Sequence, residues 1–233
     1  MADMRRFSKI FALVLCLLTV ASCGAAFAVE QTKEMKRMSV FLSNFTEAGL
    51  FNFDLKDGDD DEDETFNEYE EAKIHLGNPN NVTELIRFGI VHNLINNYKS
   101  RIRRCSDPDC ESGSLIVDKK FVFESVKKYF GLDISQRDMS VIEENQSVVF
   151  SYDGKLFHFD ADSFKEPDND TVYYADVLGV IRKGKNLSLA GDIYNSKRKT
   201  DRPGMFAATV RPVGDTWVII DMTTDWVTNA GRD

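Results

Sequence analysis

The fold is decided late in the chain, between Val172 and Tyr194, where the sequence is VYYADVLGVIRKGKNLSLAGDIY. The hydrophobic period along this stretch is close to two, which is typical of strands that bury one face in a sheet. Lys183-Gly184-Lys185 separates its two halves and supplies the glycine that a tight turn favours. The stretch therefore predicts a long antiparallel hairpin.

Two further hairpins are predicted by the same period. They are formed by residues 147–152 with 155–160 and by residues 205–213 with 217–224, around turns at Asp153-Gly154 and Gly214-Asp215. Pairing across the first turn puts Phe150 and Phe157 on one face, which we assign to the core, and His158 on the opposite face. Three consecutive hairpins predict a curved antiparallel sheet of about six strands.

Three helices are expected ahead of these strands. Their apolar side chains recur at helical spacing in residues 33–48, 81–98 and 118–131. Asn81 and Glu84 form the pattern of a capping box, and Asp118 and Gly131 suit the two ends of the third helix. Helices followed by an antiparallel meander define an α+β fold, with three N-terminal helices packed on the curved sheet. This architecture is similar to cystatin-like and NTF2-like domains, which often leave a pocket between helix and sheet.

The second expected helix carries an uncharged polar stripe. Gly89, His92, Asn93 and Asn96 recur at i, i+3, i+4 and i+7, where a solvent-facing stripe would normally hold lysine or glutamate. Two interpretations stay open, a buried polar network that holds the fold and the lining of a pocket. For a pocket, the further lining residues would come from the aromatic side chains of the strands, namely Tyr173, Tyr174, Tyr194, Trp217 and Trp226.

The N-terminus has the composition of an export signal. Three cationic side chains lie among the first nine residues, ahead of an uncharged run from Ile10 to Val20 that is too short to span a bilayer. The run leads into Val20-Ala21-Ser22-Cys23, which resembles the lipobox of bacterial lipoproteins. We therefore expect residues 1–22 to be removed as a lipoprotein signal peptide and Cys23 to carry the acyl chains, such as palmitate, of a membrane anchor.

A different processing route stays open. Cleavage after Ala26-Phe27-Ala28 would release a soluble periplasmic protein instead of an anchored one. Gly24 follows the cysteine, and by resemblance to Gram-negative sorting rules this favours the outer membrane if the source has one. Behind the anchor we expect a tether at residues 23–32, a single domain at 33–226 and a C-terminal tail at 227–233.

The two remaining cysteines lie close together. Cys105 and Cys110 flank an aspartate-rich turn that contains a proline, and export to an oxidising compartment favours a disulfide between them. Half of a metal site is the alternative, but the chain has no second cysteine pair and its three histidines lie far away in sequence. The spacing predicts a local disulfide and no metal.

Negative charge is concentrated in one segment. Removal of the expected signal peptide changes the formal net charge from −9 to −11, and residues 54–71 contribute −10 through eleven acidic side chains and one lysine. The segment lacks the regular ligand spacing of an EF-hand, so we interpret it as a solvated acidic insertion. The basic residues of the chain are not interleaved with aromatic side chains, which argues against a nucleic-acid-binding protein.

Several short motifs carry a resemblance to a known family. Phe41-Leu42-Ser43-Asn44-Phe45 and Leu85-Ile86-Arg87-Phe88-Gly89, followed by His92-Asn93 and Ile95-Asn96, are similar to the paired helical motifs of an uncharacterised family of bacterial secreted proteins and lipoproteins. The likeness extends through Lys128-Tyr129-Phe130-Gly131 to the late strands. It implies an exported protein with one domain, and the family has no assigned activity.

Three function classes agree with these observations. The first is a non-catalytic envelope lipoprotein that binds a protein, a cell-wall component or a lipid. The second is a small-molecule binder with an NTF2-like pocket, and the third is an envelope hydrolase. The chain carries no nucleophile elbow, zinc-protease, P-loop or dinucleotide motif, so we expect no catalytic residue and no cofactor.

Overall fold

The computed structural model describes residues 32–56, 73–106, 110, 114–139, 150–164 and 171–226. Contacts divide the chain after Thr32, and every element named below belongs to the unit that begins at Lys33. The expected signal peptide, Cys23, nearly all of the tether, most of the acidic insertion and the C-terminal tail lie outside the described residues. Among the helices that are described, none combines the length and the apolar character needed to cross a bilayer.

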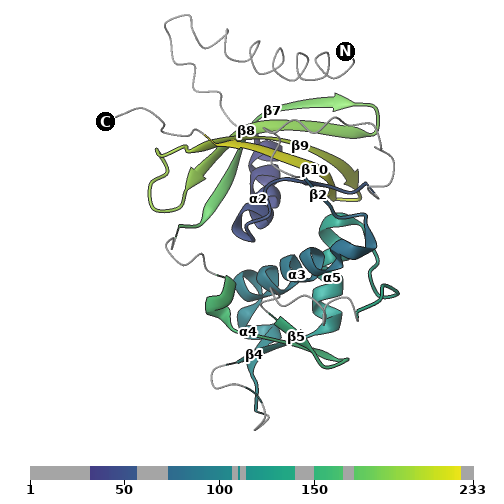
Figure 1. The fold of residues 1–233 in the computed structure, drawn as a ribbon. Helices are drawn as coiled ribbons and strands as arrows, with labels where there is room; N and C mark the ends of the chain where they lie inside the picture. Colours follow the sequence, from purple (N-terminus) through teal and green to yellow (C-terminus); the bar gives the residue numbers. More distant parts are fainter. Residues whose placement is uncertain are drawn as a thin grey trace, which may run out of the picture. The chain divides into compact units, whose positions relative to one another are not determined.

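The larger sheet has the strand order β2-β1-β10-β9-β8-β7 (Figure 1). Its strands are β1 (Phe53–Asp54), β2 (Ile74–His75), β7 (Tyr173–Lys183), β8 (Asn186–Asn195), β9 (Gly204–Val213) and β10 (Thr216–Trp226). The four long strands form the expected antiparallel meander, and Gly184 and Gly214 take positive φ angles of 61° and 57° in its β7–β8 and β9–β10 turns. The two late hairpins of the sequence analysis are therefore confirmed.

A second sheet corrects the expectation that all strands belong to one. Its strand order is β3-β4-β6-β5, and its strands are β3 (Ile102–Arg104), β4 (Leu115–Asp118), β5 (Phe150–Tyr152) and β6 (Leu156–Phe159). The hairpin around Asp153-Gly154 pairs here, against β4, and not with the long meander. Strands of two to four residues are too short for a hydrophobic period to be recognised, so the partners of this hairpin gave no sequence signal.

The helices are α2 (Lys33–Glu47), α3 (Val82–Asn96), α4 (Tyr98–Arg101) and α5 (Lys119–Phe130). The ends expected for α5 are confirmed, because the Asp118 carboxylate accepts from the Lys120 backbone N–H and Gly131 ends the helix at a φ of 70°. The capping box expected at Asn81 does not form. The Asn81 amide instead donates to the His75 carbonyl, and a short 3-10 helix (Pro79–Asn81) leads into α3.

Helix α2 protects the open edge of the larger sheet. The hydroxyls of Ser39 and Ser43 accept from the backbone N–H groups of Val177 and Ala175 on the edge strand β7, at 2.9 and 3.1 Å. The Thr46 hydroxyl donates to the Tyr173 carbonyl at 2.7 Å. An uncovered edge strand is a template for aggregation, because its backbone N–H and C=O groups are free to pair with another chain. The hydroxyl side chains of α2 lie three or four residues apart and form hydrogen bonds with some of these backbone groups of β7.

The opposite side of α2 enters an aromatic core shared with α3 and α5. Phe45 is fully buried, and its ring contacts the rings of Phe88 and Phe130 at centroid distances of 5.2 and 5.4 Å. Helices α3 and α5 approach closely at Gly89, where an added Cβ would lie 2.6 Å from Val122 Cγ1. The glycine in the polar stripe therefore serves helix packing.

Candidate functional site: a basic groove with an aromatic floor

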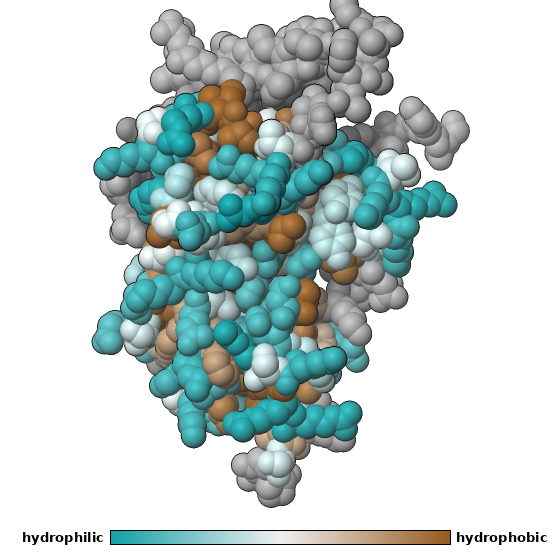
Figure 2. Space-filling model, turned by 180° about the vertical axis from the view of Figure 1, so that it is seen from behind, coloured by the Kyte–Doolittle hydropathy of each residue, from teal (hydrophilic) through white to brown (hydrophobic). Residues whose placement is uncertain are grey.

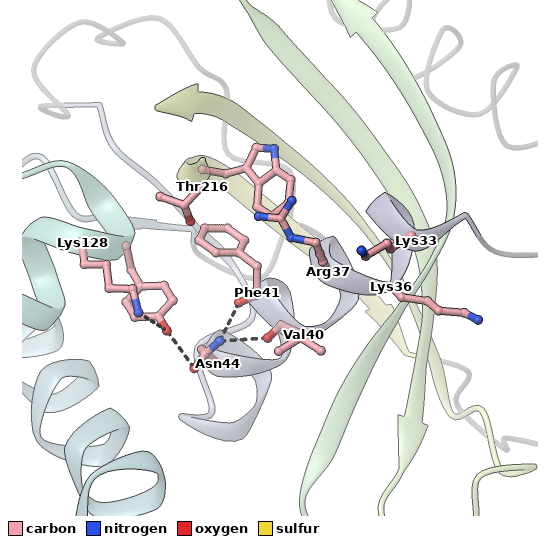
Figure 3. Close-up of a pocket in the computed structure, with 10 residues that line it drawn as sticks. Lys33, Lys36, Arg37, Val40, Phe41, Asn44, Lys128 and Thr216 are labelled. Atoms are coloured by element: carbon pink, nitrogen blue, oxygen red, sulfur yellow. Dashed lines mark hydrogen bonds between the residues drawn. The ribbon is translucent and has the colours of Figure 1, made fainter. Parts of the chain in front are cut away.

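An open groove of about 440 Å³ lies between α2, the end of α5 and the start of β10 (Figure 3). It is lined by Lys33, Lys36, Arg37, Val40, Phe41, Asn44, Lys128, Tyr129, Thr216 and Trp217. The α2 residues recur at helical spacing and therefore share one face of that helix. We call this site the α2–α5 groove.

Aromatic rings form the floor of the groove. Phe41, Tyr129 and Trp217 are 7%, 5% and 6% exposed and come from three different elements. The Phe41 ring stacks on Tyr129 at a centroid distance of 5.5 Å and meets the Trp217 ring edge-on at 5.9 Å. Each ring is thus fixed by another, and the floor is in place before any ligand arrives.

Cationic side chains form the rim. Lys33, Lys36, Arg37 and Lys128 are exposed, and the lining residues that the structure describes include no aspartate or glutamate. The Arg37 guanidinium donates to the Asp215 carbonyl at 2.6 Å and lies 5.2 Å from the Trp217 ring centroid. These two contacts hold the charged group of Arg37 over the Trp217 ring.

A polar network begins at the groove and continues into the core. Tyr129 Oη lies 3.2 Å from Asn44 Oδ1 in the groove wall and 3.1 Å from His92 Nε2 behind it. His92 Nδ1 lies 3.0 Å from Ser125 Oγ, and Ser125 in turn donates to the Phe121 carbonyl. Side chains of α2, α3 and α5 therefore meet in one polar network, in which the single proton of Tyr129 serves either His92 Nε2 or Asn44 Oδ1.

Burial determines the protonation of this network. Desolvation, assisted by the positive charges of Lys128 and Arg101, lowers the pKa of His92 from 6.5 to about 4. Desolvation also raises the pKa of Tyr129 to about 12, with a contribution from the charge of Glu47. Both side chains are neutral at pH 7, so the network carries hydrogen bonds and no charge.

The contact between Ser125 and His92 is structural. Ser125 is 2% exposed and gives its single hydroxyl proton to a backbone carbonyl, so it is neither accessible nor polarised as a nucleophile. The hydrogen-bond partners of His92 are a serine and a tyrosine, and no described carboxylate orients it. This geometry does not support the hydrolase interpretation.

The polar stripe of α3 is only partly buried. Asn93 is fully buried, and its amide donates to the Gly89 and Phe121 carbonyls and to Ser125 Oγ at 2.8 to 3.1 Å. Asn96 is exposed, contrary to the expectation that the whole stripe lies under cover, and its amide is 3.4 Å from Asn44 Oδ1. The stripe therefore passes from buried at Asn93 to exposed at Asn96, in the last turn of α3.

The strand aromatics expected to line one pocket lie in three places. Trp217 is in the α2–α5 groove. Tyr173 packs on Trp226 at a centroid distance of 5.1 Å, together with Phe51. Tyr194 pairs with Tyr174 on neighbouring strands at 5.5 Å. Of this set, only Trp217 belongs to the groove.

The expected disulfide is confirmed. Cys105 and Cys110 are joined, with their Cα atoms 6.3 Å apart. All three histidines of the chain lie far from these cysteines in sequence, which is why no metal site is expected there. The structure brings His158 Nδ1 to 3.3 Å from Cys110 Sγ, which the sequence did not indicate.

The cations that α2 contributes to the groove were not expected from the sequence. Lys33, Lys36 and Arg37 recur on one face of the first helix, which is a recognisable signal for a basic surface. The position of Lys128 beside them depends on how α5 packs against α2, for which the sequence offers no pattern. No protein-family model, curated protein or solved structure matches the chain.

Proposed function

We propose that the protein is a non-catalytic binding lipoprotein of the cell envelope. In this proposal the acylated Cys23 anchors the chain to a membrane, the outer membrane in a Gram-negative source, and the α2–α5 groove binds the head group of an anionic phospholipid. The observation that carries the proposal is the combination of an exposed cationic rim and a buried aromatic floor, with no carboxylate among the described lining residues.

The charge of the groove opposes the charge of the chain. The whole chain has a formal net charge of −9, yet the groove lining contains four cations. Within the described ranges, none of these four forms an ion pair with an aspartate or glutamate side chain. Each cation near an anionic lipid surface contributes about 1 kcal/mol of attraction, which favours a phosphate-bearing ligand.

The groove also offers apolar contact to the ligand. Val40 lines the groove and is 69% exposed, and the Trp217 ring lies beside the charged group of Arg37. An amphiphile satisfies both kinds of surface, with its phosphate at the cations and its glycerol and first acyl carbons against Val40. A wholly polar anion would leave the apolar surface at Val40 exposed to water.

The length of the tether supports a membrane ligand. Lys33 follows Cys23 by ten residues, which reach at most about 35 Å when fully extended. An acylated Cys23 would therefore keep the first cations of α2 within about 35 Å of the bilayer surface. The local concentration of lipid head groups at that distance is high, so weak binding at each groove suffices.

Two finer statements belong to the same proposal. The α2 helix against the long meander is similar to the helix and sheet of cystatin-like and NTF2-like domains, and we propose that architecture for the larger sheet. We also propose that the chain is related to the uncharacterised family of bacterial secreted proteins and lipoproteins that its helical motifs resemble. Neither statement adds an activity.

A small-molecule binder is the second candidate, favoured by the pre-formed floor of the groove. Its ligand would be a soluble anion with an aromatic or apolar part. An envelope protein or a cell-wall component that presents acidic groups would use the same cations. The experiment below separates these ligands from a lipid head group.

Vesicle binding tests the proposal. The mature chain, residues 23–233 with Cys23→Ser, is titrated with vesicles of phosphatidylglycerol or of phosphatidylcholine while tryptophan emission is followed in a Trp226→Phe background. Because Trp217 is then the only tryptophan and lines the groove, we expect its emission to change with phosphatidylglycerol alone. Binding should weaken as salt is raised.

A matched variant provides the control. Lys36→Gln/Arg37→Gln/Lys128→Gln removes three charges from the groove, and Arg182→Gln/Lys183→Gln/Lys185→Gln removes three exposed charges around the β7–β8 turn. We expect a loss of affinity of tenfold or more in the first variant and less than threefold in the second. Equal losses, or equal binding to both lipids, would contradict the proposal. A change in Trp217 emission on addition of millimolar glycerol phosphate, with no binding to either vesicle, would favour the soluble ligand.

A further inference from the structure

A cysteine pair, a histidine and an aspartate meet on the outer face of the smaller sheet. In this sheet Arg103, Ile116 and His158 lie opposite one another on β3, β4 and β6. Cys105 lies two residues after Arg103 and continues the ladder through a backbone hydrogen bond to the Ser114 carbonyl. The period of two therefore places Cys105 on the same face as His158.

The histidine is already oriented toward the sulfur atoms. The Asp153 Oδ2 atom lies 2.9 Å from His158 Nε2 and accepts its proton, which leaves the lone pair of Nδ1 directed at Cys110 Sγ, 3.3 Å away. The other carboxylate oxygen of Asp153 accepts from the backbone N–H groups of Lys155 and Leu156 at 2.8 and 2.7 Å. The β5–β6 turn therefore fixes the carboxylate, and the carboxylate fixes the imidazole.

This is the arrangement of a metal ligand set with its supporting carboxylate. The sulfur atoms of Cys105 and Cys110 and a ring nitrogen of His158 lie within 4.8 Å of one another. Zinc binds thiolate at about 2.3 Å and imidazole at about 2.0 Å, so tetrahedral ligand atoms lie roughly 3.5 Å apart. The present distance between Cys110 Sγ and His158 Nδ1 is close to that value, and only the two sulfur atoms must separate.

We propose that Cys105, Cys110 and His158 form a zinc site that opens when the disulfide is reduced. A dithiol reductant delivers two electrons and two protons to the S–S bond and is itself oxidised to a disulfide. Zn²⁺ then displaces the two thiol protons, binds both thiolates and His158 Nδ1, and keeps a water molecule as its fourth ligand. The oxidised protein holds no such site, because a disulfide sulfur has no thiolate charge to offer.

Cobalt substitution tests the site directly. The mature chain with Cys23→Ser retains Cys105 and Cys110 as its only cysteines, so every thiolate signal comes from this pair. After reduction with a phosphine we expect one equivalent of Co²⁺ per chain, with the visible bands of tetrahedral cobalt and a thiolate charge-transfer band. Zn²⁺ should displace these bands, and the oxidised chain should show neither.

Variants assign the ligands and their support. His158→Asn should weaken Co²⁺ binding by at least tenfold, and Asp153→Asn by tenfold to a hundredfold through loss of imidazole orientation. His75→Asn is the matched control, because His75 also contacts a carboxylate, Asp54 Oδ1 at 2.9 Å, but is not among the described groups of metal-ligating side chains. It should bind as the parent does.

The acidic insertion requires its own control. Cys105→Ser/Cys110→Ser keeps every carboxylate and measures their background binding of metal, which should lack the charge-transfer band. The disulfide closes a loop of only a few residues, so the circular dichroism of the reduced chain should match that of the oxidised chain. A folded, reduced chain that binds no Co²⁺ at micromolar concentration would overturn the proposal, as would binding that is insensitive to His158→Asn.

Discussion

His92 Nε2 lies 3.1 Å from the hydroxyl of Tyr129, so a buried histidine of α3 contacts a side chain that lines the α2–α5 groove. The same hydroxyl is 3.2 Å from Asn44 Oδ1 on α2. The groove wall is therefore continuous with the buried polar side chains between α3 and α5.

The first prediction concerns acid stability. Because the folded pKa of His92 is about 4 and its ordinary value is 6.5, the unfolded chain takes up the proton first. The stability that the neutral form of His92 contributes to the folded state is complete above pH 6.5. As the pH falls toward 4 this contribution is lost, and the free energy of unfolding decreases by up to about 3 kcal/mol. Denaturant melts at pH 7 and pH 4.5 should show a smaller pH-dependent loss in His92→Gln than in the parent. Parallel losses would show that His92 is not the group that titrates.

The second prediction compares two asparagines of one helix. Asn93→Leu removes the donor to the Phe121 carbonyl and Ser125, and leaving such buried groups unpaired should lower the free energy of unfolding by about 1 to 3 kcal/mol. Asn96→Leu, on the exposed end of α3, should change it by less than about 0.5 kcal/mol. Urea melts of the two variants measure both values, and equal effects would contradict the assigned burial.

The third prediction concerns the contact between α3 and α5. Alanine is a better helix former than glycine by about 1 kcal/mol, but the Cβ of Gly89→Ala would meet Val122 Cγ1 at 2.6 Å and the Val122 carbonyl at 2.9 Å. We expect a net loss of about 1 to 3 kcal/mol in the free energy of unfolding. Gly89→Ala/Val122→Ala should recover part of the loss if the side-chain clash is the cause. A more stable single variant would mean that the helices can move apart without cost.

The fourth prediction concerns the anchor, which rests on the sequence alone. Cys23→Ser should leave an unlipidated protein in the soluble envelope fraction, whereas the parent should partition with membranes. Intact-mass analysis of the parent should show acyl chains on a chain that begins at Cys23. A mature protein that begins at Val29 would instead demonstrate ordinary cleavage after Ala28.

The four long strands and the third helix expected from the sequence were predictable from local sequence patterns. The β7–β10 meander follows from alternation and from glycines in the turns, and both ends of α5 follow from Asp118 and Gly131. These signals are local, since each depends on residues a few positions apart. The short strands β1 to β4 depend on pairing with distant segments, and a strand of two to four residues contains too little of a period to recognise.

The candidate site was predictable only in part for the same reason. The uncharged stripe of α3 correctly indicated buried polar groups at His92 and Asn93, but the sequence did not indicate where α3 ceases to be covered, so Asn96 was misplaced. Trp217 was identified as a lining residue, while its cationic neighbours were not. Figure 2 shows a face of the molecule on which hydrophilic side chains predominate and the hydrophobic patches are separate from one another.

The Tyr129 hydroxyl has one proton and two acceptors, His92 Nε2 and Asn44 Oδ1. With His92 neutral and Nδ1 protonated, the proton of Tyr129 belongs to Nε2, and Asn44 Oδ1 is left to accept from Asn96 or from a molecule in the groove. Protonation of His92 reverses the direction of the hydroxyl, which must then donate to Asn44. One rotating hydroxyl thus couples the ionisation of the buried His92 ring to the hydrogen bonds that Asn44 Oδ1 accepts at the groove wall.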